Sequence, residues 1–284
     1  MIHTTLISVA TLAANLHAPD WLVVDCRHEL SDPGKGECCY REGHIPGAVF
    51  ADISRDLADT SKPGLGRHPL PDEVAFAAVL ARLGWTPRHQ VVVYDDAGGA
   101  FAARLWWMLR LVGHHAVAVL DGGIQAWTAA GLPLDTTLPS PRTGSIEVHY
   151  DRGQVLYYEA LQDGLAAQSL RVLDARGAPR YRGEVEPIDR IGGHIPGAWN
   201  RPYMDNLGSD GRFKPADRLR EEFAAVIGPF APSAVAHSCG SGVTACHNLL
   251  AMEHAGLSGS RVFAPSWSGW SSDPSRPVAT GAVP

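Results

Sequence analysis

Short apolar runs alternate with longer amphipathic stretches along the whole chain. The apolar runs include residues 21–26, 91–95 and 115–121, and helical periodicity covers 72–84 and 100–113. Nearly continuous β-branched runs that alternate with helices are typical of a parallel sheet covered on both faces. The pattern therefore predicts an α/β fold built on parallel β-sheets flanked by helices.

The same pattern occurs twice. VVDCRHE at 23–29 returns as VLDARGA at 172–178, and the turn GHIPGA begins at both Gly43 and Gly193. The segment 91–113 aligns without a gap on 234–256. A period of about 145 residues has the size of a domain and is far longer than a solenoid repeat, so it indicates a tandem duplication.

Two domains follow from this duplication. Pro, Thr and Gly interrupt all periodicity near the middle of the chain. We expect an N-terminal domain at 1–135, a linker at 136–150 and a C-terminal domain at 151–284.

Composition and net charge narrow the classes of molecule that the protein is expected to bind. The 284 residues are 45% hydrophobic and 19% charged, and the net charge is −6. An acidic chain has no general electrostatic reason to bind nucleic acid or an anionic membrane. The first residues lack the basic start of a signal peptide, and no run approaches the roughly 20 apolar residues of a membrane span. We expect a cytoplasmic protein that acts on small molecules.

The five cysteines form no C-x-x-C pair and fit no disulfide framework, so we expect reduced thiols. A metal site made of His237, Cys239, Cys246 and His247 is conceivable, but these spacings match no common zinc pattern. We therefore expect neither a metal nor a cofactor.

Cys239 is the candidate nucleophile. It lies in HSCGSGVTA, where an apolar strand ends and a helix begins, which is where ligands bind in parallel α/β sheets. Gly240 and Gly242 permit a tightly curved loop whose amides point inward, and Thr244 is expected to cap the helix. Such amides stabilise a thiolate, or an anionic second sulfur attached to it. The other cysteines are interpreted as packing residues or incidental surface thiols.

These motifs resemble the tandem-domain sulfurtransferases, which comprise rhodaneses and 3-mercaptopyruvate sulfurtransferases. The resemblance covers nearly the whole chain and rests mainly on CGSGVTA at 239–245 and on both GHIPGA turns. It implies two rhodanese-like domains, of which only the second carries sulfur, as a persulfide on Cys239. In the gapless alignment Asp96 takes the place of Cys239 in the first half, so we expect that half to be catalytically inactive.

The resemblance also implies site residues. The loop CGSGVT resembles the 3-mercaptopyruvate type, whereas thiosulfate-type loops carry two cations after the cysteine. It implies catalytic roles for Ser241 and His68, and substrate binding by Arg180 and by the loop itself, through Gly240, Gly242, Val243 and Thr244. The aspartate expected beside His68 is Asp52 or Asp56, and Arg190 is a candidate second carboxylate-binding arginine. The acceptor is a thiol or cyanide, with thioredoxin among the candidates.

Three alternatives remain beside this interpretation. Thiosulfate is the alternative donor. A cysteine phosphatase requires C-x5-R, but Ala245 stands where the arginine belongs. A non-catalytic binding module is the third alternative, and the complete cysteine loop argues against it. The two Asp-x-Arg strand ends (Asp25, Arg27, Asp174, Arg176) and the histidines of both GHIPGA turns (His44, His194) are interpreted as structural.

Overall fold

A computed structural model of the protein describes residues 2–140 and 144–284, so residues 141–143 of the predicted linker and residue 1 of the predicted first domain lie outside the described residues. The chain forms two compact units. Unit 1 comprises the described residues of 1–59, 70–151 and 209–212, and unit 2 comprises 60–69, 152–208 and 213–284. Residues 60–69 thus belong to unit 2 although they lie early in the sequence. The linear division at 136–150 stays a prediction.

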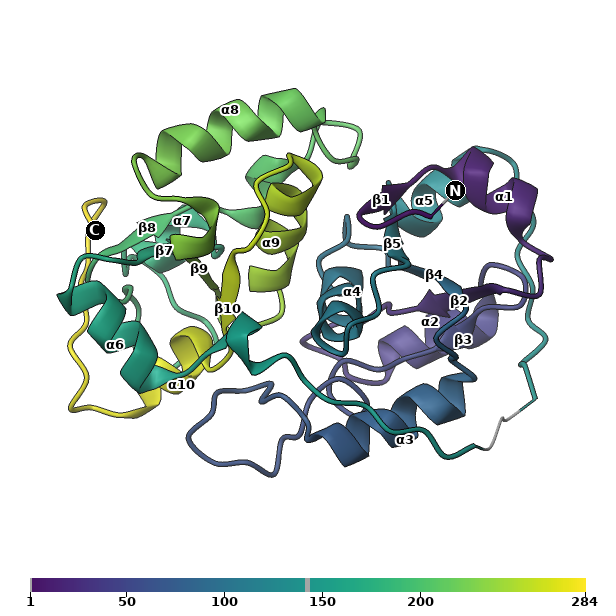
Figure 1. Cartoon of the computed structure of the whole chain (residues 1–284), viewed down its shortest axis with the longest axis horizontal. Helices are drawn as coiled ribbons and strands as arrows, with labels where there is room; N and C mark the ends of the chain where they lie inside the picture. The colour runs from purple at the N-terminus through teal and green to yellow at the C-terminus, as the bar shows by residue number, and fades with distance from the viewer. Residues whose placement is uncertain (1, 141–143) are drawn as a thin grey trace. The chain divides into compact units, whose positions relative to one another are not determined.

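Each unit is built on a five-stranded parallel sheet (Figure 1). In unit 1 the order is β1-β5-β4-β2-β3, formed by β1 (Leu6–Ile7), β2 (Trp21–Asp25), β3 (Val49–Phe50), β4 (Gln90–Tyr94) and β5 (Val117–Leu120). In unit 2 the order is β6-β10-β9-β7-β8, formed by β6 (Val155–Leu156), β7 (Arg171–Asp174), β8 (Ala198–Asn200), β9 (Val235–Ser238) and β10 (Arg261–Phe263).

Helices surround both sheets. Unit 1 has α1 (Val9–Asn15), α2 (Lys35–Glu42), α3 (Glu73–Leu83), α4 (Ala102–Leu111) and α5 (Gly123–Ala129). Unit 2 has α6 (Tyr158–Ala166), α7 (Ala178–Tyr181), α8 (Ala216–Ile227), α9 (Ala245–His254) and α10 (Ser266–Ser272), with short 3-10 turns at Arg152–Gln154, Tyr203–Asn206 and Pro232–Ala234. The predicted α/β fold, with two parallel sheets flanked by helices, is confirmed.

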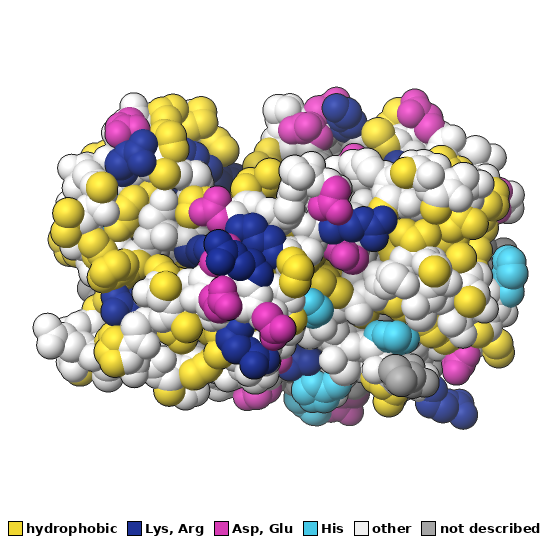
Figure 2. Space-filling view, turned by 90° about the horizontal axis from the view of Figure 1, so that it is seen from above, with side chains coloured by type: hydrophobic (Ala, Val, Ile, Leu, Met, Phe, Trp, Pro, Cys, Tyr) yellow, Lys and Arg dark blue, Asp and Glu magenta, His cyan; other side chains and the backbone are white. Residues whose placement is uncertain are grey.

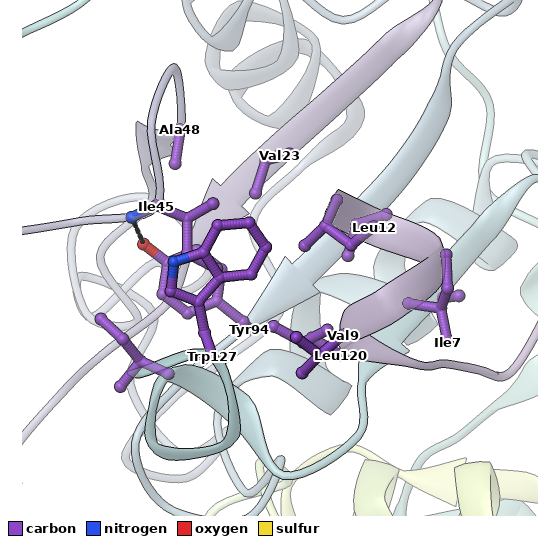
Figure 3. Packing of buried hydrophobic residues seen from close by; sticks show 12 residues of the cluster. Ile7, Val9, Leu12, Val23, Ile45, Ala48, Tyr94, Leu120 and Trp127 are labelled. Atoms are coloured by element: carbon purple, nitrogen blue, oxygen red, sulfur yellow. Dashed lines mark hydrogen bonds between the residues drawn. The ribbon is translucent and has the colours of Figure 1, made fainter. Parts of the chain in front are cut away.

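In the core of unit 1, the apolar runs form the sheet and the amphipathic stretches form helices on its two faces. Leu12 of α1 and Trp127 of α5 pack with Val23 and Val92 of the sheet on one face (Figure 3). In the same cluster the Tyr94 hydroxyl accepts a hydrogen bond from the Ile45 amide at 3.2 Å. Since α4 contacts β4 and β5 but contributes no residue to this cluster, it covers the other face. Strands buried on both sides explain the nearly continuous apolar runs.

The duplication extends to side-chain contacts. Arg27 donates to Asp25 at 2.7 Å and to the Gly43 carbonyl at 2.7 Å. In unit 2, Arg176 makes the equivalent bonds to Asp174 and to the Gly193 carbonyl, both at 2.6 Å. These buried pairs join a strand end to the GHIPGA turn, which agrees with their structural interpretation.

The surface carries mixed charge. On the face drawn in Figure 2, basic and acidic side chains gather next to one another. Among the helices of the described residues, none has the length and apolar character needed to cross a bilayer.

Candidate active site

The loop 239–244 connects β9 to α9 in unit 2, at the carboxyl edge of the sheet. Gly242 has a φ of +81°, a conformation that favours glycine, whereas Gly240 is not among the positive-φ glycines of the described residues. This turn brings the Gly242 amide to 3.1 Å from Cys239 Sγ, to which it donates a hydrogen bond. Only 1% of Cys239 is exposed, so the sulfur lies at the bottom of the loop and suits a small donor.

In the equivalent loop of unit 1, the backbone amides already donate to a carboxylate of the chain itself, that of Asp95. Asp95 follows β4, is fully buried, and accepts four backbone hydrogen bonds of 2.8–2.9 Å, from Ala97, Gly99, Phe101 and Ala102. Ser238 occupies the position of Asp95 in unit 2. Within the described part of unit 2, the amides of Gly240, Thr244 and Ala245 donate no hydrogen bond. The second loop therefore keeps donors for an anion, as P-loop-like amide nests do.

Ser266 holds the cysteine backbone and was missed by the sequence interpretation. Its Oγ accepts the Cys239 amide at 3.1 Å and donates to the Phe263 carbonyl at 3.0 Å. Its φ of +51° is unusual for a residue other than glycine, and Gly123 takes the same position in unit 1 with a φ of +57°. The signal available in the sequence was that Ser266 aligns with a glycine, Gly123, in the internal repeat.

His68 and Ser241 lie together although 173 positions separate them. His68 Nδ1 is 2.8 Å from Ser241 Oγ, and both side chains are buried. Both belong to unit 2, because 60–69 packs with that unit. A histidine beside a hydroxyl at the nucleophile loop can relay a proton, but the catalytic roles of both stay predictions.

The two candidate aspartates have other partners. Asp52 Oδ1 accepts the amides of Ser54 and Arg55, and its Oδ2 lies 3.7 Å from His28 Nδ1. Asp56 accepts the Asp52 amide at 2.8 Å and forms an ion pair with Arg82 at 2.8 Å. Although burial opposes it, the nearby His28 and the hydrogen bonds from the amides hold the pKa of Asp52 below its usual value. Either aspartate as the partner of His68 stays a prediction.

Two guanidinium groups face the loop. An ideal β-carbon on Gly240 would lie 3.3 Å from Arg67 Nη2 and 3.7 Å from Arg180 Nη1. Arg180 was predicted from the resemblance, and Arg67 was missed, although it directly precedes His68 in GRHPLP. The candidate Arg190 instead donates from Nε to the Ser271 carbonyl at 2.8 Å.

A third guanidinium lies deeper. Arg176 stacks over Trp267 at 4.6 Å and is almost entirely buried. Burial alone would lower the pKa of Arg176, but the nearby charges of Asp174, Glu186 and Cys239 raise it above its usual value. The cysteine therefore lies within the electrostatic reach of a permanent cation.

The remaining loop residues are Val243 and Thr244, whose substrate-binding roles, like those of Gly240 and Gly242, stay predictions. Val243 is buried, but Thr244 has helical φ and ψ of −73° and −10° and its side chain makes no capping hydrogen bond. The predicted Thr244 cap is wrong, because a capping side chain needs the extended backbone that this position lacks.

The conceivable metal set does not assemble. No group of three or more His, Cys, Asp or Glu side chains suited to a metal occurs among residues 2–140 and 144–284. Instead His237 Nε2 lies 3.0 Å from Ser260 Oγ, His247 Nδ1 lies 3.2 Å from Asn206, and the Cys246 thiol donates to the Gly242 carbonyl at 3.3 Å. These residues support the strand and the helix beside the loop.

All five cysteines are free thiols. Cys26 and Cys246 are buried, Cys39 is partly buried, and Cys38 is exposed with its thiol 3.5 Å from Glu42. Burial and nearby carboxylates raise the pKa of the Cys26 thiol well above its usual value. Among the five, only Cys239 combines an amide donor with neighbouring cations, so it is the sulfur best suited to hold negative charge.

Comparisons with known proteins agree with this geometry. A sequence model of the rhodanese-like domain matches residues 8–130. A Pseudomonas aeruginosa protein named "Probable 3-mercaptopyruvate sulfurtransferase" is 49% identical over 283 residues, 99% of this chain and 100% of that protein. The thiosulfate sulfurtransferase of Cricetulus griseus is 33% identical over 279 residues, 95% of this chain and 93% of that protein.

Solved structures include SseA from Escherichia coli, described as a 3-mercaptopyruvate sulfotransferase with the rhodanese fold. It has a TM-score of 0.81 and 30% identity, and the match covers 94% of this chain and 100% of SseA. SseA thus shares the architecture of this chain, and the relatives carry names with two different sulfur donors.

Proposed function

Since the chain belongs to the tandem rhodanese-like sulfurtransferases and is an enzyme of sulfur transfer, we propose that Cys239 is its sulfur carrier and that 3-mercaptopyruvate is its donor. The observation that supports this most directly is the hydrogen bond of 3.1 Å from the Gly242 amide to Cys239 Sγ. Amide donors stabilise an anionic sulfur before and after it acquires a second sulfur.

The first half-reaction moves one sulfur. The Cys239 thiolate attacks the sulfur of 3-mercaptopyruvate, a sulfur–sulfur bond forms, and the carbon–sulfur bond breaks. The bonding pair goes to the carbon as an enolate, and the proton of the donor thiol ends on that carbon, which gives pyruvate. His68 and Ser241 are suited to relay this proton, because Nδ1 and Oγ are 2.8 Å apart. The product on the enzyme is the Cys239 persulfide.

In the second half-reaction an acceptor attacks the outer sulfur of the persulfide and the Cys239 thiolate returns. A thiol or cyanide has the required nucleophilicity, and we include thioredoxin among the thiols. Five free cysteines suit a reducing compartment, so we propose that the reaction occurs in the cytoplasm.

Thiosulfate is the second candidate donor. Arg67 and Arg180, which face Gly240, favour it, because together they supply two cations near the nucleophile. The loop itself carries no charge after Cys239, and Ser241 with His68 suits a donor that has a thiol proton to move. These features favour 3-mercaptopyruvate.

Mass spectrometry after donor treatment tests the proposal. We expect one added sulfur, about 32 Da, on the Cys239 peptide. The Cys239→Ser variant should lose sulfur transfer, whereas Cys38→Ser, which changes an exposed thiol, should keep it. Sulfur on another cysteine with Cys239 unmodified would refute the carrier assignment.

A further inference from the structure

Unit 1 has a cavity of about 310 Å³ at the carboxyl edge of its sheet. The cavity is lined by the segment after β2 with the start of α2, and by the loop after β4. In the order β1-β5-β4-β2-β3, the chain continues from β2 to β3 on one side and from β4 to β5 on the other. Parallel α/β sheets bind ligands at such a switch point. The proposed reaction leaves this cavity without a role.

Asp96 gives the cavity a negative charge. It lines the cavity in the sequence position of Cys239, beside loop amides that already donate to Asp95. Within the described residues Asp96 forms no ion pair. Burial and the charge of Asp95 raise the pKa of Asp96, and Arg27, which opposes this shift, is already paired with Asp25. A ligand cation would stabilise the charged form of Asp96.

Lys35 gives the same cavity a positive charge. Its side chain is exposed and has no ion pair in the part of the chain that the structure describes. Lys35 is the first residue of α2, where the helix dipole disfavours a cation, so helix stability does not account for it. The amide of Gly36, which also lines the cavity, donates no hydrogen bond to any described residue. An ammonium group beside a helix N-terminal amide suits a carboxylate.

A buried imidazole completes the polar lining. The His28 side chain is only 2% exposed and packs edge-on against Phe101, with ring centroids 5.3 Å apart. Its Nδ1 lies 3.7 Å from Asp52 Oδ2, and neither ring nitrogen has a hydrogen-bond partner among residues 2–140 and 144–284. Because a carboxylate beside Nδ1 favours the proton on that nitrogen, Nε2 is left as an acceptor. Buried polar groups are normally hydrogen-bonded, so this imidazole at a cavity wall indicates a ligand site.

The size and the remaining walls of the cavity limit the ligand. About 310 Å³ is at the lower end of the range for small-molecule sites. Ala97 and Phe101 add apolar walls, and Cys39 lies four positions after Lys35 on the same face of α2. The space beside the charged groups therefore suits a short, uncharged side chain.

We propose that this cavity of unit 1 binds a small α-amino acid as its zwitterion. The ammonium group of the ligand pairs with Asp96 and donates to His28 Nε2. Its carboxylate pairs with Lys35 and accepts from the Gly36 amide, and its side chain packs against Phe101. The proposal stands apart from the sulfur transfer proposed above, so the failure of one leaves the other untouched.

An NMR titration of the ¹⁵N-labelled full chain with L-alanine tests the site. We expect the amide signals of Gly36, Cys39 and Ala97 to shift and to saturate with a Kd of about 1 mM or below. The site is refuted if these signals stay unchanged up to about 10 mM, ten times that Kd. It is equally refuted if only the signals of the loop 239–244 shift.

Two truncated ligands test the charge pairs, since ethylamine keeps only the ammonium group and propionate only the carboxylate. Asp96→Asn should weaken L-alanine binding about tenfold without weakening propionate, and Lys35→Gln should weaken L-alanine about tenfold without weakening ethylamine. A variant that weakens both of its ligands alike acts through the structure, which would refute that pair. If ethylamine binds wild-type protein as tightly as L-alanine does, the site recognises a cation alone and the amino-acid assignment is wrong.

Arg88→Gln is the matched control for Lys35→Gln. Arg88 is another exposed cation of unit 1 that forms no ion pair with a described residue, but it precedes β4, at the amino edge of the sheet. We expect this variant to bind L-alanine as wild type does. Equal weakening by Arg88→Gln and Lys35→Gln would show a general effect of net charge and would contradict direct contact with Lys35.

Discussion

His68 Nδ1 and Ser241 Oγ lie 2.8 Å apart, although the two residues come from opposite halves of the sequence. Their segments meet because 60–69 packs within unit 2. The pair can act as one proton relay beside Cys239, and a relay works only when both members are present.

This relay predicts non-additive kinetics. His68→Gln and Ser241→Ala should each lower kcat/KM for 3-mercaptopyruvate about 100-fold, and the double variant should lose little more than the worse single variant. With thiosulfate, which has no thiol proton, the loss should be smaller. Two independent losses that simply multiply in the double variant would contradict the relay.

Two substitutions of the strained Ser266 should lower activity alike but differ in their effect on stability. Ser266→Gly and Ser266→Ala both remove the Oγ that accepts the Cys239 amide, so both should lower kcat to a similar extent. Only glycine relieves the φ of +51°, a conformation that costs other residues about 1–2 kcal/mol. Thermal unfolding should therefore show the alanine variant as the less stable of the two. Equal stability would show that the backbone is not strained here.

Removal of the buried Asp95 carboxylate of unit 1 should lower the stability of the protein strongly. Asp95→Ala leaves four amides without an acceptor, two of them buried and two partly buried, and should lower the free energy of unfolding by about 3 kcal/mol or more. The neighbouring Asp96→Ala is the control. Burial and the charge of Asp95 raise the pKa of Asp96, so its charge is unfavourable and its removal should cost little. Urea unfolding of both variants decides between these outcomes.

The buried His237 should make the stability of the folded protein fall in acid. Burial lowers its pKa from 6.5 to about 3, so between these values the unfolded chain binds a proton that the folded chain does not. Stability from this group is therefore full above about pH 6.5 and is lost as the pH falls, by up to about 1.4 kcal/mol per pH unit. In urea unfolding at pH 7.5 and 5.5, His237→Asn should show a weaker dependence on pH. His149→Asn, at an exposed histidine, should match wild type.

The internal repeat explains how much of the fold could be predicted. A gapless alignment of 91–113 on 234–256 places α4 on α9, and the structure gives bounds of 102–111 and 245–254, offset by the same 143 positions as the alignment. Helical periodicity depends only on neighbouring residues, and two copies of a similar sequence are expected to form the same elements. The sheet orders of the two units correspond strand for strand for the same reason.

The site could be predicted only in part. Cys239 and its glycines stand in one short motif, whereas Arg67 reaches Gly240 from 173 positions away, and an arginine in a polar loop has no distinguishing pattern. Ser266 was missed because a positive φ is not encoded by its residue type. The Thr244 cap was wrong because residue preference alone does not specify the φ and ψ of a loop.

The loop that holds Asp95 is ordered without any ligand, whereas the loop after Cys239 has amides that still lack an acceptor. The amides of the two loops should therefore differ in their rates of hydrogen–deuterium exchange. The amides of Phe101 and Ala102 should exchange slowly whether or not donor has been added, because the carboxylate always protects them. Those of Thr244 and Ala245 should exchange faster in the resting enzyme and slow down once Cys239 carries sulfur. The loop of unit 1, which has Asp96 in the position of Cys239, thus provides an internal rigid reference against which the sulfur-loaded and resting states of the other loop can be compared.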